Sequence, residues 1–160
     1  MTELKTPLVN LLDVQEFCGL SRNITEKEYN RFILTAQNTV LREELGEDLV
    51  DALVNLGTDV NLEMLLDDFV KPFLSHESFV HYSMQSSMKS TKSGIKRMEG
   101  ENTESGSRGE YSSVSSLHQK NADAYLKRTI CFLEDNIDNF PLYTSKKQPV
   151  AKRSIFTSKG

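Results

Sequence analysis

The chain has 160 residues, of which 38% are hydrophobic and none is tryptophan, so it can form one modest core with part of the chain outside it. No apolar run approaches the length of about 18 residues that a membrane-spanning helix needs. Residues 144–160 carry five basic and no acidic side chains, whereas the preceding 143 residues carry 14 basic and 23 acidic ones. This charge pattern disfavours a nucleic-acid-binding domain and favours a basic tail that docks on an acidic surface.

The first two predicted helices have clear ends. Residues 8–20 predict a short helix that ends at Gly19. The strongest helical signal follows, because Thr25 and Glu28 have the spacing of a capping box. Apolar side chains then recur at spacings of three and four, as in an amphipathic helix: Tyr29, Phe32, Ile33, Ala36 and Val40. We expect Gly46 to end this helix in a left-handed conformation.

The next helix begins immediately after Gly46. Glu47 and Asp48 are acidic residues of the kind that the first turn of a helix favours. The buried face of this helix is predicted to consist of Leu49, Val50, Leu53 and Leu56, with Gly57 after its end. The two helices therefore form a tight antiparallel hairpin with a minimal loop.

A third predicted helix begins at Asn61, with an inward face of Leu62, Leu65, Leu66, Phe69 and Val70. Pro72 is expected to kink or break it, because proline has no N–H group for the helical hydrogen bonds. The apolar helical pattern continues beyond Pro72 to about Met88. We expect this last segment to be the central helix of the fold.

Residues 89–113 are rich in Gly, Ser and charged residues, and we expect a long polar loop with a two-stranded ribbon turning near Gly100. A final helix is predicted from about Ser115 to Asn139, followed by Pro141. Its inward face is predicted to consist of Leu117, Asn121, Ala124, Ile130, Leu133 and Ile137.

The predicted fold class is all-α. It is a small bundle of four to five helices over residues 1–143, followed by an extended basic tail at 144–160. The predicted core includes Phe32, Ile33, Ala36, Val40, Leu49, Leu53, Leu66, Phe69, Phe79 and Ile130.

The sequence nominates no catalytic site, no metal site and no cofactor. His76 and His81 are five residues apart and so lie on different helix faces, and His118 is isolated in the sequence. We interpret them as polar residues at the edges of packed helices. Cys18 and Cys131 are expected to be buried, reduced thiols. Phosphate-binding and nucleophile motifs are missing from the sequence, so we expect no enzyme.

Several stretches together resemble a known class of proteins. These are "ITEKEYNRFILTAQNTVLREELGEDLVDAL", "LLDDFVKPFLSHESFVHYSM", the Gly/Ser loop, and a final helix that closes in "FPLY". With their A-Q, L-G-E and K-P landmarks they resemble the small head–tail connector proteins of tailed phages. The chain is most similar to the ring proteins of crAss-like and other Bacteroidetes phages. The resemblance spans roughly residues 9–143 and does not include the basic tail.

The resemblance implies a structural protein of the virion neck, made in the host cytoplasm. Such connector proteins are helical bundles that assemble as rings, typically twelve-fold, between the portal protein and the adjoining rings of the neck and tail. Genomic DNA passes through the ring without specific binding. Two alternatives stay open from the residues themselves: a small cytosolic helical adaptor, and a DNA-binding protein that uses the loop and the tail.

The loop and the tail supply the predicted partner-binding residues. We expect the loop to be mobile in the free subunit and ordered by a partner ring, and the tail to cross onto a neighbouring acidic subunit. The candidates in the loop are Ile95, Arg97, Met98 and Tyr111. The candidates in the tail are Lys146, Lys147, Val150, Lys152, Arg153, Ile155 and Phe156.

Overall fold

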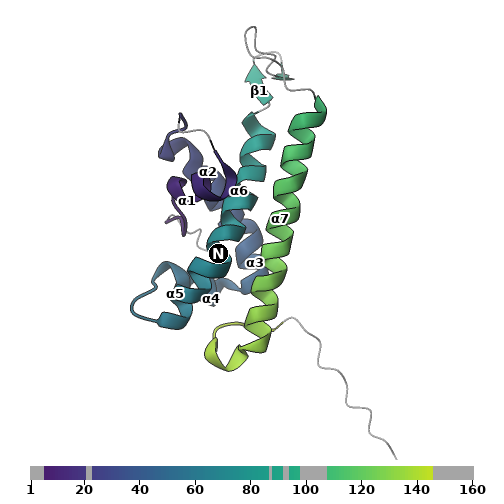
Figure 1. Cartoon of the computed structure of the whole chain (residues 1–160). Coiled ribbons are helices and arrows are strands. Elements are labelled where there is room, and N and C mark those ends of the chain that lie inside the picture. The colour runs from purple at the N-terminus through teal and green to yellow at the C-terminus, as the bar shows by residue number, and fades with distance from the viewer. Residues whose placement is uncertain (1–5, 21–22, 87, 92–93, 98–107, 146–160) are drawn as a thin grey trace, which may run out of the picture.

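In a computed structural model of the chain, residues 6–20, 23–86, 88–91, 94–97 and 108–145 are described. The fold is the predicted all-α bundle, with a two-stranded ribbon at one end (Figure 1). The elements in chain order are α1 (Leu11–Cys18), α2 (Glu26–Ala36), η1 (Gln37–Leu41), α3 (Arg42–Leu45), α4 (Glu47–Val54), α5 (Val60–Leu65), η2 (Leu66–Val70), α6 (Lys71–Ser86), β1 (Met88–Thr91), β2 (Gly94–Arg97), α7 (Arg108–Asp135) and η3 (Ile137–Asn139).

The helix ends that carry local signals lie close to where the sequence predicts them. α1 begins with a capping box, in which Asn10 Oδ1 accepts a hydrogen bond from the Asp13 N–H at 2.9 Å and the Asp13 carboxylate accepts one from the Asn10 N–H at 2.9 Å. The helix ends at Gly19, which has φ 65° and ψ 29°. At the start of α2 the Glu28 carboxylate accepts a hydrogen bond from the Thr25 N–H at 3.4 Å. These ends are decided by neighbouring residues in the chain.

The predicted tight turn between two helices at Gly46 is present, although the glycine conformation differs from the expected one. Gly46 has φ 90° and ψ 154°, which lies outside the left-handed helical region and is open almost only to glycine. It separates α3 from α4 by a single residue. The side chain of Arg42 spans this turn, with its Nη2 atom 3.2 Å from the Asp51 carboxylate and 3.9 Å from that of Glu47. α4 then ends at Val54, before the predicted Gly57.

Pro72 was predicted to kink or break the helix, and it does not break it. The chain is helical from α5 through η2 into α6. The N-cap of α5 is Asp59 and not the predicted Asn61, because the Asp59 side chain accepts hydrogen bonds from two first-turn N–H groups. η2 is a π-helical turn in which the Lys71 N–H bonds to the Leu66 carbonyl, five residues back. This wider turn directly precedes Pro72, so the proline ring and its missing N–H are accommodated without ending the helix.

α6 is the central helix, as predicted, and it packs against α1, α2 and α7. In Figure 1, α7 runs alongside α6 in the opposite direction, and α5 lies at the lower end of the helix that continues into α6. Seven consecutive residues, 72–78, are buried, so the helix is covered on every side in its first half. The elements of the bundle therefore meet around one helix.

Two predictions about the second half of the chain were wrong. β1 and β2 pair antiparallel with Thr91 opposite Gly94, so the chain turns across residues 92–93 and not near Gly100. α7 begins at Arg108, so the end of the predicted loop is helical. The predicted inward face of α7 was only partly right: Leu133 is buried as predicted, but near the start of the helix His118 and Ala122 are buried whereas Leu117 is 56% exposed.

The core is one continuous cluster that includes most of the predicted residues. Of the predicted set, Phe32, Ile33, Ala36, Leu49 and Leu53 are buried, and Val40, Leu66, Phe69, Phe79 and Ile130 are half-buried. No helix in the described part of the chain is long and apolar enough to cross a membrane.

The Phe32 ring is buried against the rings of Tyr29 and Tyr82. Replacement by alanine removes this packing and leaves a cavity, so we expect Phe32→Ala to lower the free energy of unfolding by about 3–5 kcal/mol. Chemical denaturation with circular dichroism measures it. Phe17→Ala is the control, because Phe17 is 38% exposed and its loss should cost about 1 kcal/mol or less. Equal stability losses in the two variants would contradict the described packing.

Candidate functional site: a buried cysteine–histidine cluster

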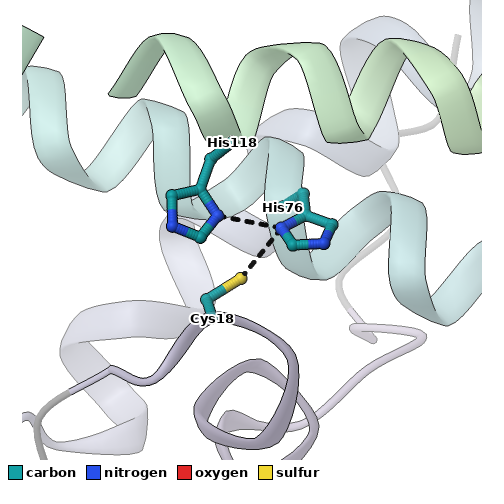
Figure 2. A group of neighbouring side chains, drawn as sticks. All are labelled: Cys18, His76 and His118. Atoms are coloured by element: carbon teal, nitrogen blue, oxygen red, sulfur yellow. Dashed lines mark hydrogen bonds between the residues drawn. The ribbon is translucent and has the colours of Figure 1, made fainter. Parts of the chain in front are cut away.

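Three chemically reactive side chains from distant parts of the chain meet next to the central helix. Cys18 is the last residue of α1, His76 lies in α6, and His118 lies in α7. Figure 2 shows the Cys18 sulfur and the His118 ring both pointing toward the His76 ring. We call these three residues the Cys–His cluster. It joins the N-terminal helix to the α6–α7 pair.

The three side chains are in hydrogen-bonding contact. Cys18 Sγ lies 3.3 Å from His76 Nδ1, and His76 Nδ1 lies 2.9 Å from His118 Nδ1. Cys18 Sγ also lies 3.4 Å from the carbonyl oxygen of Ser75, to which it can donate its proton. His76 Nδ1 is therefore the central atom of the cluster, in contact with both other side chains.

Packing fixes the orientation of both rings. His76 is 6% exposed and His118 is 9% exposed. The His76 ring stacks on Tyr125 at a centroid distance of 5.7 Å, and the His118 ring contacts Phe79 at 4.2 Å. These aromatic contacts fix the planes of both imidazoles, and the hydrogen bonds then select the ring edges that carry Nδ1.

Burial keeps the cluster uncharged at neutral pH. Burial, and in second place the neighbouring His118, lowers the pKa of His76 from its ordinary value of 6.5 to about 4. Burial also lowers the pKa of His118, and it raises the pKa of the Cys18 thiol to about 12. At neutral pH the cluster consequently contains a protonated thiol and two neutral imidazoles.

The interpretation of these histidines as separate edge residues was wrong for His76 and His118. They are 42 residues apart in sequence and meet only because α6 and α7 pack side by side. His81 does stay apart from the cluster, 3.5 Å from the Glu77 carboxylate. The ligand atoms of Cys18, His76 and His118 lie within 4.8 Å of one another, so in composition the cluster is a set of metal ligands.

Gln37 is a second buried polar residue that the sequence interpretation missed. Gln37 lies next to Ala36 of the apolar stripe in sequence, and it is fully buried in η1. Its Oε1 atom accepts a hydrogen bond from the Leu8 N–H at 2.9 Å, and its Nε2 atom donates one to the Thr6 carbonyl at 3.1 Å. One amide side chain thus holds the backbone that leads into α1, and with it the position of Cys18.

The predicted partner-binding residues are not part of the Cys–His cluster. Ile95 and Arg97 lie in β2, paired with Ser90 and Met88, and Tyr111 lies in the first turn of α7. The remaining candidates lie outside the described residues: Met98, Lys146, Lys147, Val150, Lys152, Arg153, Ile155 and Phe156. The prediction that all of them contact partners stays a prediction.

The fold and the cluster define a helical bundle with a polar centre on its middle helix. A family model that is described as a family of unknown function, DUF6712, matches residues 21–153, and the chain belongs to this family. Comparison with curated proteins and with solved structures gave no match.

The lowered pKa values of His76 and His118 predict an acid-sensitive fold. The unfolded chain takes up protons near the ordinary pKa of 6.5, which the folded chain does only at lower pH. The contribution of the two neutral histidines to the free energy of unfolding is therefore fully present above pH 6.5 and is lost as the pH falls. We expect the free energy of unfolding to fall between about pH 7 and pH 5, with a shallower slope in a His76→Gln, His118→Gln double variant.

Urea denaturation with a chelator present, so that no metal ion competes with protons, measures this slope. His81→Gln is the control, because His81 lies outside the cluster and its replacement should leave the slope unchanged. An unchanged slope in the double variant would show that the acid sensitivity has another origin.

Proposed function

We propose that this chain is a structural subunit of the virion, which assembles as a head–tail connector ring between the portal protein and the tail of a phage. The placement in the virion neck rests on the sequence resemblance over residues 9–143. The all-α fold is compatible with it, because connector proteins of this kind are helical bundles. We propose no enzymatic activity and no specific DNA sequence as a ligand.

The observation that carries ring assembly is a second face of α7 that the subunit leaves uncovered. Val114 is 46% and Leu117 is 56% exposed, and Ala124 and Cys131 are also exposed. Leu117, Ala124 and Cys131 follow one another at intervals of seven residues, so they share one face of the helix. We call these four residues the α7 outer stripe. Small and apolar residues at heptad spacing are suited to packing against a helix of another subunit.

The charges in two regions of the subunit support a head-to-tail contact. Exposed acidic residues gather on α4, α5 and η2: Asp48, Glu63, Asp67 and Asp68. The exposed charged residues near the α7 outer stripe have a small basic excess: Lys120, Lys127 and Arg128 against Asp123 and Asp135. The acidic residues lie on α4 and at the α5 end of the α5–η2–α6 helix, and the α7 outer stripe is exposed, so the acidic region of one copy can face the α7 outer stripe of the next. Contacts of this heterologous kind close into a ring when the rotation between copies allows it.

The net charge also fits a protein that surrounds DNA without holding it. The first 143 residues carry a net charge of −9. A wall with an excess of acidic side chains makes few phosphate contacts, so DNA can slide past it. This is the reason for proposing passage of the genome without specific binding.

A charge placed in the α7 outer stripe should block assembly without unfolding the subunit. We expect Leu117→Asp and Ala124→Asp to convert ring particles into monomers, because each places a carboxylate in an apolar contact. Negative-stain microscopy and light scattering of the purified protein detect the change. Ser116→Asp is the matched control, since this exposed residue introduces the same charge about 100° around the helix.

Cys131 was expected to be buried, and this prediction was wrong because the residue is exposed. Its thiol gives a second measurement on the unmodified chain. Cys131 should react readily with a thiol reagent in the monomer and slowly in the ring, as the neighbour covers it. Two results would rule out this interface. One is that Cys131 reacts as fast in ring particles as in the monomer, and the other is that the Leu117→Asp and Ala124→Asp variants still form rings. A monomeric protein that mass spectrometry does not detect in virions would instead favour the cytosolic adaptor.

The basic tail is proposed to strengthen the same assembly. Residues 144–160 carry five positive charges, and the acidic region of a neighbouring copy offers a complementary surface. Deletion of 144–160 should leave the melting temperature of the monomer nearly unchanged and weaken assembly. Assembly of the full chain should also weaken as salt rises, whereas the truncated chain should respond less. Equal assembly of the two chains at low salt would exclude this role.

A further inference from the structure

The ligand types of the Cys–His cluster are those of a transition-metal site. One sulfur and two imidazole nitrogens converge from α1, α6 and α7. No carboxylate belongs to the set, which disfavours Mg²⁺ and Ca²⁺, whereas thiolate and imidazole together are typical ligands of Zn²⁺. We propose that Cys18, His76 and His118 bind one divalent ion of the zinc class, which fastens α1 to the α6–α7 pair.

Two of the three distances between ligand atoms are close to those that a tetrahedral ion requires, and the third pair, Cys18 and His118, lies within 4.8 Å. Bonds of about 2.0–2.1 Å to nitrogen and about 2.3 Å to sulfur imply tetrahedral edges of about 3.3 Å between nitrogens and about 3.6 Å between sulfur and nitrogen. The two Nδ1 atoms are 2.9 Å apart, and Cys18 Sγ is 3.3 Å from His76 Nδ1. Small side-chain rotations that widen these two pairs by about 0.3–0.4 Å make room for the ion.

His76 Nδ1, the central atom of the cluster, lies at hydrogen-bonding distance from two partners at once. A neutral imidazole nitrogen carries either one proton or one lone pair. An ion at the centre of the cluster uses the lone pairs of His76, His118 and Cys18 together.

The thiol is the group that changes its protonation. When the ion binds, the sulfur–hydrogen bond of Cys18 breaks, a metal–sulfur bond forms, and the proton goes to solvent. The doubly charged ion and the thiolate leave one net positive charge. Three protein ligands leave a fourth position for a water molecule or for the Ser75 carbonyl oxygen, which lies 3.4 Å from Cys18 Sγ.

The ion would act as a clip between segments that are distant in sequence. Cys18 is 58 residues from His76 in the sequence, and His118 lies a further 42 residues along the chain. A bond network that closes such long loops stabilises the docking of α1, because the unfolded chain has no preformed site. This inference does not depend on the proposed connector role.

Cobalt substitution tests the site directly on the full-length chain. We expect Co²⁺ added to the metal-free protein to bind at one equivalent, with the intense visible bands of a tetrahedral ion and a near-ultraviolet sulfur-to-cobalt charge-transfer band, both displaced by Zn²⁺. Lack of the charge-transfer band would overturn the proposal without any need for a variant, because it would show that no thiolate is a ligand.

The chain offers matched controls, since it contains one further cysteine and one further histidine. Cys18→Ser and His118→Gln should weaken Co²⁺ binding by about 100-fold or more, which exceeds the usual effect of losing an outer hydrogen-bond partner. Cys131→Ser and His81→Gln should bind as the parent does. Zn²⁺ should raise the melting temperature of the parent and of the two controls only. Equal binding by Cys18→Ser and Cys131→Ser would place the metal elsewhere and overturn the assignment.

Discussion

The burial of polar side chains on the central helix is the constraint on which the rest of the bundle depends. Residues 75–78 of α6 read Ser-His-Glu-Ser and are all buried. A buried polar group without a partner costs about 1–3 kcal/mol, so each neighbour of α6 has to bring a partner to a defined position. His76, Glu77 and Ser78 have such partners, which come from three helices: Cys18 of α1, Tyr29 of α2, and His118 and Gln119 of α7. The buried Ser75 hydroxyl has no hydrogen-bond partner among the described residues, and only the Ser75 carbonyl is engaged.

These contacts fix the neighbours in register as well as in place. The Tyr29 hydroxyl lies 3.3 Å from Ser78 Oγ, and Gln119 Nε2 donates to the Glu77 carboxylate at 3.2 Å. Burial raises the pKa of Glu77, while the nearby His81 and the bond from Gln119 act in the opposite direction. Apolar packing alone would tolerate a shift of α7 along α6, whereas a shift by one residue would break the contacts of His118 and Gln119 together.

The two proposals use opposite sides of the same helix pair. The Cys–His cluster faces inward between α1, α6 and α7, and the α7 outer stripe faces away from α6. A metal ion that fastens α1 would stiffen the subunit from inside, and subunit contacts would cover Leu117, Ala124 and Cys131 from outside. Because they involve different residues, substitutions in one region leave the other intact, and the two can be tested separately.

The sequence by itself determined the features that neighbouring residues control. The capping residues Asn10 and Thr25, the glycine ends at Gly19 and Gly46, and the amphipathic stripe of α2 all depend on contacts within one or two helical turns. The spacing of residues along the chain indicates such local contacts, so the all-α fold and the central position of α6 could be predicted.

Only the tertiary structure decided where the polar residues of different helices meet. His118 and Leu117 are adjacent in α7, and hydropathy favours Leu117 as the inward residue. His118 is nevertheless the one that is buried, because His76 and Phe79 on α6 supply a polar and an aromatic contact to it. The π-helical turn before Pro72 has the same kind of origin, since packing on both sides of α6 keeps the helix continuous where the local sequence favours a break. Contacts across 42 and 58 residues leave no periodic signal in a single chain, and so the cluster could not be predicted from the sequence.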